Sequence, residues 1–468
     1  MVFSSFAFLF YFFPAFFLLY FLTPNSFKNL VIFIGSLVFY FYGVMENPGY
    51  LVLILLSVFV NFFVSQGMDK RNRNSVRKRW LYVGLIYDFG MLFLFKYLDF
   101  AILNLNRVIG WVDPAYSLPY ANLVLPIGIS FYTFQISSYL VDIYRKKIPV
   151  ERSILKLGTY LCMFPQLIAG PIITYSQVRD SLTERKHSLR AWENGIRKFT
   201  AGLALKVLIA NRVGGLWTQV GTIGYESIST PLAWLGIIAF SLQIYFDFYG
   251  YSLMAKGLGE IMGFSFPDNF KDPYLAGSMT EFWRRWHITL GSWFKEYVYI
   301  PLGGNRKHPY RNLLIVWLFT GLWHGAGWNY VLWGLFCFLL ILIEKAGMKK
   351  WLDKFPALGH CYMLLAIPLS WLLFAVSDIT QIVIYLGRLF PFTAGAQTAV
   401  FAGDFVKYLS SHAGSLAAAL LCCSGLPRKF YLKNKDSIWM TLLLVIVFWF
   451  CVYSMYIGLD DPFLYYQF

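Results

Sequence analysis

The sequence predicts an all-α integral membrane protein, a bundle of about 10–12 transmembrane helices. Of its 468 residues, 58% are hydrophobic and only 14% are charged, whereas a soluble globular domain has roughly 25% charged residues. Apolar runs of the roughly 20 residues that a helix needs to cross the hydrocarbon recur along the chain. No polar linker separates these runs, so we expect one polytopic domain, residues 1–468, with its core at 120–345.

The apolar segments are the expected helices. Uninterrupted segments of spanning length lie near 5–22, 29–44, 49–66, 81–98, 120–143, 191–213, 231–252, 360–377 and 438–458. Shorter or interrupted segments lie at 153–174, 310–345 and 413–424. The first segment has no charge before Lys28, unlike the basic start of a cleaved signal peptide, so we expect it to remain as the first span.

The loops between the segments predict the orientation of the chain. Basic residues concentrate at 69–80, 145–156 and 428–436, which carry six, five and four basic groups and one acid each. Short loops rich in Lys and Arg face the cytoplasm, so the N-terminus is expected on the outer, extracytoplasmic side of the membrane. The same loops account for much of the net charge of +16, and we expect no nucleic-acid partner.

Two of the interrupted segments are expected not to cross as simple spans: 153–174 as a re-entrant or surface-lying helix, and 310–345 as a broken one. Irregular backbone at membrane depth is tolerated where it is buried in protein or lines a wet cavity. We therefore expect 153–174, with Gln166 beside its prolines, to line an interior path. We expect 310–345 to break near His324 and to place this histidine at the inner end of a half-helix, facing a cavity. The glycines expected to cause that break are Gly321, Gly325 and Gly327.

Residues 280–334 contain three of the six histidines, among them His287 and His324, and also a family resemblance. The stretch includes EFWRRWHITLGSWFKEYVYIPLGGNR followed by GLWHG, and the chain has PQLIAGPI at 165–172, DFYGYSLMAKGLGEIMGF at 247–264 and PDNFKDPYL at 267–275. These strings resemble the membrane-bound O-acyltransferase family, within it the bacterial alginate O-acetylation subgroup. The resemblance implies a multi-helix bundle with re-entrant segments around a central cavity or tunnel. It also implies a catalytic histidine at His324 and a second polar site residue at His287.

The histidines suit general-base chemistry without a protein nucleophile. The chain has no G-x-S-x-G string and no Asp five residues after a histidine, and its six cysteines show no C-x-x-C spacing. The wide separation of His287 and His324 is no metal-ligand spacing, so we expect no metal site. A neutral imidazole can take the proton of a hydroxyl as its oxygen attacks a thioester, and such a base contributes about 10²–10⁴-fold. Burial favours the neutral form of an imidazole.

Each of these assignments has a plainer alternative. A histidine in an apolar run is often a satisfied core residue, and for His287 this alternative stays open. For His324 it is weaker, because the flanking glycines interrupt what would otherwise be a simple span. The residues expected to shape the cavity are Trp323, Trp328 and Asn329.

The longest polar stretch, between the segments that end near 252 and begin near 311, is expected in the cytoplasm. It has eight basic groups against five acids. Guanidinium groups pair with phosphate, so this surface suits acetyl-CoA, which enters as the acyl-donor substrate rather than as a bound cofactor. The residues expected to contact its phosphates are Arg284, Arg285, Lys295 and Arg306. Ordinary cytoplasmic loop charge explains the same residues without a ligand.

The favoured hypothesis is an O-acetyltransferase that moves acetyl from cytoplasmic acetyl-CoA toward an extracytoplasmic cell-surface polysaccharide. The resemblance also implies a second, extracytoplasmic partner with serine chemistry of the SGNH type, and contact with membrane lipid. One alternative is another transfer within the family, such as D-alanyl transfer to teichoic acid or acylation of a lipid or peptide. A transporter or flippase is a third hypothesis, and the lack of an obvious inverted repeat disfavours it.

Overall fold

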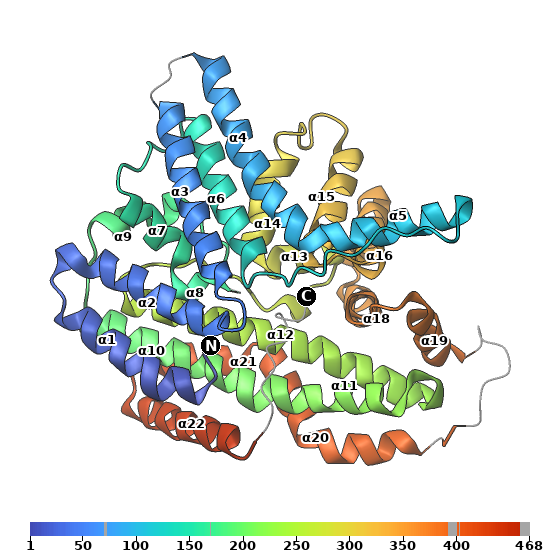
Figure 1. Ribbon diagram of the computed structural model, residues 1–468. Helices are drawn as coiled ribbons and strands as arrows, with labels where there is room; N and C mark the ends of the chain where they lie inside the picture. The colour runs from blue at the N-terminus through green and yellow to red at the C-terminus, as the bar shows by residue number, and fades with distance from the viewer. Residues whose placement is uncertain (70–72, 169, 392–399, 402, 459–468) are drawn as a thin grey trace. The chain divides into compact units, whose positions relative to one another are not determined.

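The computed structural model describes residues 1–468 except 70–72, 169, 392–399, 402 and 459–468 (Figure 1). Regular structure in the described residues is helical throughout, with no strand. Eight of the described helices are long and apolar enough to cross a membrane, or nine if the bent pair α20 (Asp404–Cys423) and α21 (Leu426–Asn434) is one span. The chain is therefore a multi-pass, all-α membrane protein, as expected. Eight or nine spans fall short of the expected 10–12, and within the described residues that number is reached if one or both of the shorter apolar helices Ala7–Leu22 and Ile379–Leu389 also cross.

The chain forms two compact units. The first comprises Met1–Gly195 and Ala255–Pro267, and the second comprises Ile196–Met254 and Asp268–Phe468. Helices α10 (Leu189–Ala204) and α12 (Thr230–Ile261) contribute residues to both.

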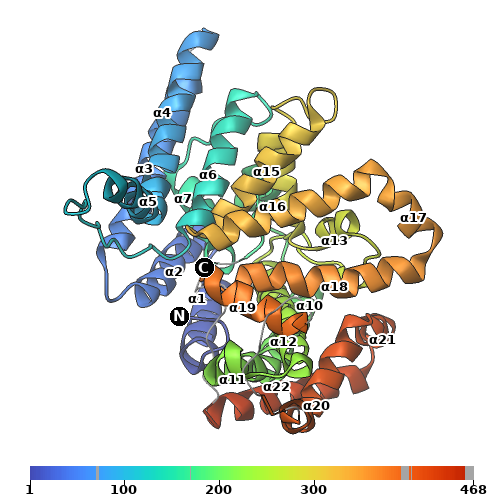
Figure 2. The ribbon, with the colours of Figure 1, turned by 90° about the vertical axis from the view of Figure 1, so that its right-hand side faces the viewer.

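In the first unit, three long helices pack together. α3 (Gly49–Asp69), α4 (Asn74–Leu92) and α6 (Ile129–Tyr144) contact one another, and α2 (Lys28–Gly43) packs on α7 (Ile154–Cys162) (Figures 1 and 2). A π-helical turn, Phe93–Tyr97, joins α4 to α5 (Leu98–Val112). The shorter helices of this unit are α1 (Phe13–Leu22), α8 (Phe164–Leu167) and α9 (Tyr175–Thr183).

The prediction of a full span at 120–143 is wrong, because the helix begins only at Ile129. Pro126 disfavours helical backbone in the residue before it. Gly128 then takes φ +77, a conformation that favours glycine, and a Cβ there would collide with the carbonyl oxygen of Leu167. By contrast, the interruption expected within 153–174 is present, since α7 and α8 are short and the described residues between α8 and α9 are not helical.

In the second unit, the segment 310–345 folds as a pair of contacting helices, α15 (Pro309–His324) and α16 (Trp328–Ile343). Gly325 and Gly327 are extended between them, so the break falls where it was expected. Gly321 was also expected to break the helix, but it lies within α15. Gly321 instead allows α15 and α16 to pack closely, because a Cβ there would come well within 3.0 Å of a carbonyl oxygen of α16. Gly334 of α16 does the same from the other side, since a Cβ on it would lie 2.5 Å from the Trp317 carbonyl oxygen of α15.

The second unit contains further helix contacts. α16 also contacts α18 (Pro356–Ala375), and α11 (Asn211–Ile223) contacts α20. The remaining elements are α13 (Met279–Arg285), α14 (Ile288–Phe294), a π-helical turn at Lys295–Tyr299, a second at Glu344–Met348, α17 (Lys349–Lys354), α19 (Ile379–Leu389) and α22 (Ile438–Tyr456).

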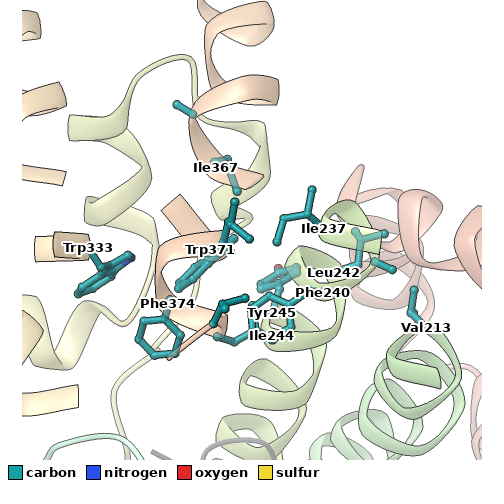
Figure 3. Close-up of a cluster of buried hydrophobic side chains, with 14 of the residues drawn as sticks. Val213, Ile237, Phe240, Leu242, Ile244, Tyr245, Trp333, Ile367, Trp371 and Phe374 are labelled. Carbon is teal, nitrogen blue, oxygen red and sulfur yellow. The ribbon is translucent and has the colours of Figure 1, made fainter. Parts of the chain in front are cut away.

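The core of the second unit is unusually aromatic. Figure 3 shows Trp333 of α16 close to Trp371 and Phe374 of α18, and the Phe374 ring centroid lies 5.4 Å from that of Trp333 and 5.5 Å from that of Trp371. Residues of α12, among them Phe240 and Tyr245, continue the same buried cluster. Tightly packed rings of this size hold their neighbours in one arrangement.

The outer faces of the long helices are apolar as well. On α22, Trp439 is 77% exposed and Ile446 is 66% exposed, and on α18 the exposed fraction of Leu364 is 72%. Large apolar surface of this kind is costly in water and favourable against lipid. The exposed side chains therefore support the assignment of these helices as membrane spans.

Candidate active site

His324 is the last residue of α15 and lies in an aromatic enclosure. Its ring centroid lies 5.0 Å from that of Trp323, 5.1 Å from that of Trp333 and 5.1 Å from that of Phe374, all at steep interplanar angles. The residue is only 7% exposed. The glycine contacts between α15 and α16 and the packing of Phe374 from α18 together hold the imidazole in place.

His287 lies between the short helices α13 and α14. Its backbone has φ 43 and ψ 53, a left-handed conformation that is uncommon outside glycine and therefore marks a constrained position. The residue is 2% exposed, and the ring of Phe248 from α12 packs edge-on at 4.7 Å between centroids.

Asn269 fixes the orientation and the proton of the His287 ring. The backbone N–H of Thr289 can only donate, so the Asn269 atom 3.3 Å from it is the acceptor Oδ1. The same Oδ1 accepts from the Thr289 hydroxyl at 2.9 Å and lies 3.1 Å from His287 Nδ1, while Asn269 Nδ2 donates to Ser252 Oγ at 3.2 Å. Nδ1 of His287 must therefore carry the proton, and the basic lone pair is on Nε2.

His287 is neutral at physiological pH. It lies outside the candidate spans, and burial lowers the pKa of its imidazole to about 3. The neutral ring has one proton, and because Asn269 holds that proton on Nδ1, Nε2 keeps its lone pair.

Trp323 brings the two histidines into one site. Its ring centroid lies 5.9 Å from that of His287 and 5.0 Å from that of His324. Two buried imidazoles thus contact the same indole, one from the junction of α13 and α14 and one from the end of α15. Residues far apart in the sequence form a single enclosure suited to proton transfer.

A carboxylate from outside this enclosure anchors α13. Glu344, at the end of α16, accepts from the backbone N–H groups of Met279 at 2.5 Å and Thr280 at 2.9 Å, and from the Thr280 hydroxyl at 2.5 Å. Helix N-termini have N–H groups without partners inside the helix and favour negative charge. Glu344 is 1% exposed, so these charge-assisted hydrogen bonds fix the start of the helix that leads to His287.

Comparison with known proteins decides the family. A family model described as MBOAT, the membrane-bound O-acyltransferase family, matches residues 138–386, which is more than half of the chain. The chain belongs to the membrane-bound O-acyltransferase family. As a member of that family it is an O-acyltransferase, and the expectation from the sequence strings is confirmed.

Curated relatives refine the comparison. The probable alginate O-acetylase AlgI of Pseudomonas putida is 36% identical over 400 residues, which cover 84% of this chain and 81% of that protein. The peptidoglycan O-acetyltransferase of Helicobacter pylori is 35% identical over 381 residues, covering 74% of this chain and 71% of that protein. The teichoic acid D-alanyltransferase of Streptococcus thermophilus is 26% identical over 242 residues, covering 48% and 58%.

The basic residues expected to bind the donor of this O-acyltransferase have different surroundings. Arg284, Lys295 and Arg306 are exposed. Arg285 already pairs with Glu281 at 2.5 Å, four residues earlier on α13, and a phosphate would compete with that carboxylate. Their role in donor binding stays a prediction.

The residues expected to line the cavity also differ. Asn329 is buried and its Nδ2 donates to the carbonyl oxygen of Phe374 at 3.4 Å, which ties the start of α16 to the ring that packs on His324. Trp328 is 44% exposed. Gln166 is fully buried in the first unit, where its Nε2 donates to the Tyr160 carbonyl oxygen. The cavity roles of these residues stay predictions.

Two residues that contact the candidate site or its supporting helix are not evident from the sequence. Asn269 lies in the string PDNF, whose only signal is the family resemblance, and Glu344 is a single acid after a long apolar run. That acid was the available signal, because an acid next to a span is expected to have a partner. Within the described residues, no group of three or more His, Cys, Asp or Glu is placed to hold a metal ion.

Proposed function

We propose that this chain is an O-acetyltransferase of the bacterial cytoplasmic membrane that takes acetyl from cytoplasmic acetyl-CoA and passes it toward a cell-surface polysaccharide. The observation that supports it most directly is the pair of buried histidines, His287 and His324, on one indole. The names of the alginate and peptidoglycan relatives support acetyl as the acyl group. The D-alanyltransferase covers about half of this chain at lower identity, so that alternative is not favoured.

The reaction is a direct acyl transfer. A hydroxyl oxygen of the acceptor attacks the thioester carbonyl while an imidazole takes the hydroxyl proton; the new C–O bond forms, the C–S bond breaks, and the proton passes to the departing thiolate. His324 is the residue proposed to take the proton. His287, neutral with its lone pair on Nε2, accepts a hydrogen bond from the acceptor hydroxyl and positions it. The aromatic walls exclude water, which would otherwise hydrolyse the thioester.

The acceptor side requires a route out of the membrane. The loop charges support a cytoplasmic donor face and an extracytoplasmic N-terminus. An extracytoplasmic enzyme with a reactive serine is the proposed partner that completes transfer to the polysaccharide, since the site described here offers a base and no nucleophile of its own.

Replacing His324 by Gln tests the catalytic assignment. Gln keeps a hydrogen-bonding side chain of similar size but cannot accept a proton near neutral pH, so transfer should fall about 10²–10⁴-fold while the variant remains folded. The assay is acetyl release from labelled acetyl-CoA in proteoliposomes, with surface-polymer acetylation measured in cells.

Two controls separate catalysis from structure and from transport. His360→Gln, at a histidine outside the site, should keep native activity, and size-exclusion profiles should show all variants monodisperse. Near-native acetylation by His324→Gln would refute the assignment and make His287 the leading candidate base. Movement of substrate without consumption of acetyl-CoA would instead support a transporter.

A further inference from the structure

The first unit has a cluster of three basic side chains that the proposed reaction does not use. Lys28 lies at the start of α2, and Arg185 and His187 lie in the loop between α9 and α10. These three residues are called the basic cluster below.

The basic cluster converges on Tyr20. The ammonium of Lys28 lies 4.9 Å from the Tyr20 ring centroid, Arg185 Nη1 donates to the Tyr20 hydroxyl at 3.4 Å, and His187 Nε2 lies 3.5 Å from the same oxygen. The Tyr20 hydroxyl in turn donates to the carbonyl oxygen of Met262 at 2.7 Å. One tyrosine therefore gathers three basic groups that come from two separate parts of the chain.

The backbone beneath the cluster is closely packed. Gly263 has φ +84, and a Cβ there would lie 3.3 Å from both Arg185 Cβ and His187 Cε1. The Arg185 guanidinium stacks 4.9 Å from the Phe264 ring centroid and donates to the side chain of Asn29. These contacts place the cationic groups in a defined arrangement, unlike the side chains of an ordinary surface loop.

The charges of the cluster are not balanced by acids. In the described part of the chain, neither Lys28 nor Arg185 has an ion pair with a carboxylate, and all hydrogen bonds of Arg185 go to neutral oxygens. Lys28 is only 7% exposed, and its ammonium contacts the rings of Tyr20 and Phe21. Burial, and then the charges of Lys28 and Arg185, lower the pKa of His187.

Two buried or half-buried cations elsewhere have acidic partners, whereas the buried Arg77 donates to the carbonyl oxygens of Ile143 and Tyr144. Lys206 lies 2.6 Å from Asp247, and Arg428 lies 2.9 Å from Asp272. Gathering like charges away from water is unfavourable unless an opposite charge compensates them. The backbone carbonyl groups at the end of α9 offset part of the Arg185 charge, since Arg185 Nε donates to the Ser181 carbonyl oxygen at 2.8 Å. Within the described residues, Lys28 has no such hydrogen bond to these carbonyl groups.

We propose that the basic cluster is a binding site for a phosphate group. Arg185 supplies a planar guanidinium and Lys28 a compact ammonium, two side chains that commonly bind phosphate in proteins. Two sources present this chemistry to the cytoplasmic side of a membrane: the phosphodiester of an anionic lipid headgroup and the phosphate of a soluble nucleotide. The aromatic rings around Lys28 suit either one, because they leave its N–H groups for the ligand.

Thermal unfolding of the full-length protein in nanodiscs tests the site. The native protein and Lys28→Gln are compared in discs of phosphatidylcholine alone and in discs with added phosphatidylglycerol. Loss of the Lys28 charge should relieve repulsion in phosphatidylcholine, so the variant should unfold at the same or a higher temperature than the native protein there. In phosphatidylglycerol the order should reverse, because only the native site gains the anion.

A second arm distinguishes the source of the phosphate. Adenosine 3′,5′-bisphosphate is titrated into phosphatidylcholine discs, and its Kd is measured for the native protein, for Lys28→Gln and for His187→Gln. The last variant is a milder change at the exposed side of the cluster and should weaken binding less than Lys28→Gln. Stabilisation by phosphatidylglycerol alone assigns a lipid headgroup. Saturable binding of the bisphosphate that Lys28→Gln weakens by about tenfold or more assigns a nucleotide phosphate.

A matched control removes charge elsewhere. Lys429→Gln with Lys433→Gln takes two cations from the exposed face of α21 and should leave both responses at native values. If Lys28→Gln responds to phosphatidylglycerol and to the bisphosphate as the native protein does, or if neither additive affects the native protein, the proposal is overturned. An equal loss of response in the α21 control would show nonspecific surface attraction and would also overturn it.

Discussion

Replacing Asn269 by Asp should shift the pH dependence of acyl transfer. The substitution keeps an oxygen acceptor for the Thr289 N–H but places a carboxylate 3.1 Å from His287 Nδ1. Burial lowers the pKa of His287 to about 3 in the native protein, and an opposite charge at such a distance raises the pKa of an imidazole by about 1–3 pH units. His287 would then gain its second proton at about pH 4–6, and the lone pair on Nε2 would be lost below that pH.

The direction of the effect follows from the role of a neutral imidazole. A raised pKa means that His287 is protonated at higher pH, so the acidic limb of the activity profile should move upward by the same about 1–3 pH units. The measurement is the rate of acetyl-CoA consumption in proteoliposomes between pH 4 and pH 8, a range of about four units around the shifted group.

Thr289→Val is the matched control for this experiment. It removes the hydroxyl that donates to Asn269 Oδ1 at 2.9 Å and introduces no charge. The cost should be about 1 kcal/mol of stability, with the pH profile unchanged. Superimposable profiles for Asn269→Asp and the native enzyme would show that Asn269 does not act through His287.

Three further outcomes are expected. Glu344→Gln should lower the free energy of unfolding by about 1–3 kcal/mol, because an N–H at the start of α13 loses its acceptor. The measurement is thermal unfolding in detergent, and native stability of the variant would contradict the capping role. Gly321→Ala should force α15 away from α16 and cost about 1–3 kcal/mol, whereas Gly90→Ala, whose added Cβ meets nothing within 4 Å, should cost nothing. A cysteine at Asn74 should react with an impermeant maleimide only from the cytoplasmic side and one at Glu226 only from outside, and labelling of both from one face would reject the topology.

Much of the fold follows from the sequence because lipid imposes a simple requirement. A helix needs about 20 apolar residues to cross, so α2, α3, α18 and α22 begin and end within a few residues of the predicted segments. The break after His324 was also predictable, since clustered glycines interrupt an apolar run. The predicted span at 120–143 is wrong because hydropathy counts apolar residues and takes no account of backbone conformation. Pro126 and Gly128 prevent a helix before Ile129.

The candidate site was only partly predictable. The sequence shows that His324 lies next to glycines in an apolar run. It does not show that Asn269 Oδ1 sets the tautomer of His287, because the fold, and not a fixed spacing in the sequence, brings Asn269 to His287. The pairing of Arg285 with Glu281 was available from their i, i+4 separation on a helix. Glu344 could be suspected as an acid beside a span, but its target on α13 depends on how α16 packs.

The interruption between α15 and α16 has an electrostatic consequence. Peptide dipoles add along a helix, so the C-terminal end of α15 has a partial negative charge and the N-terminal end of α16 a partial positive one. The two opposite ends meet within four residues, beside the imidazole of His324, where an unbroken span would present no net field. In the proposed acyl transfer, a positive charge forms on the His324 base and a negative charge on the carbonyl oxygen. A helix divided at this point offers each of them a pole of the opposite sign, with no charged side chain placed in the membrane.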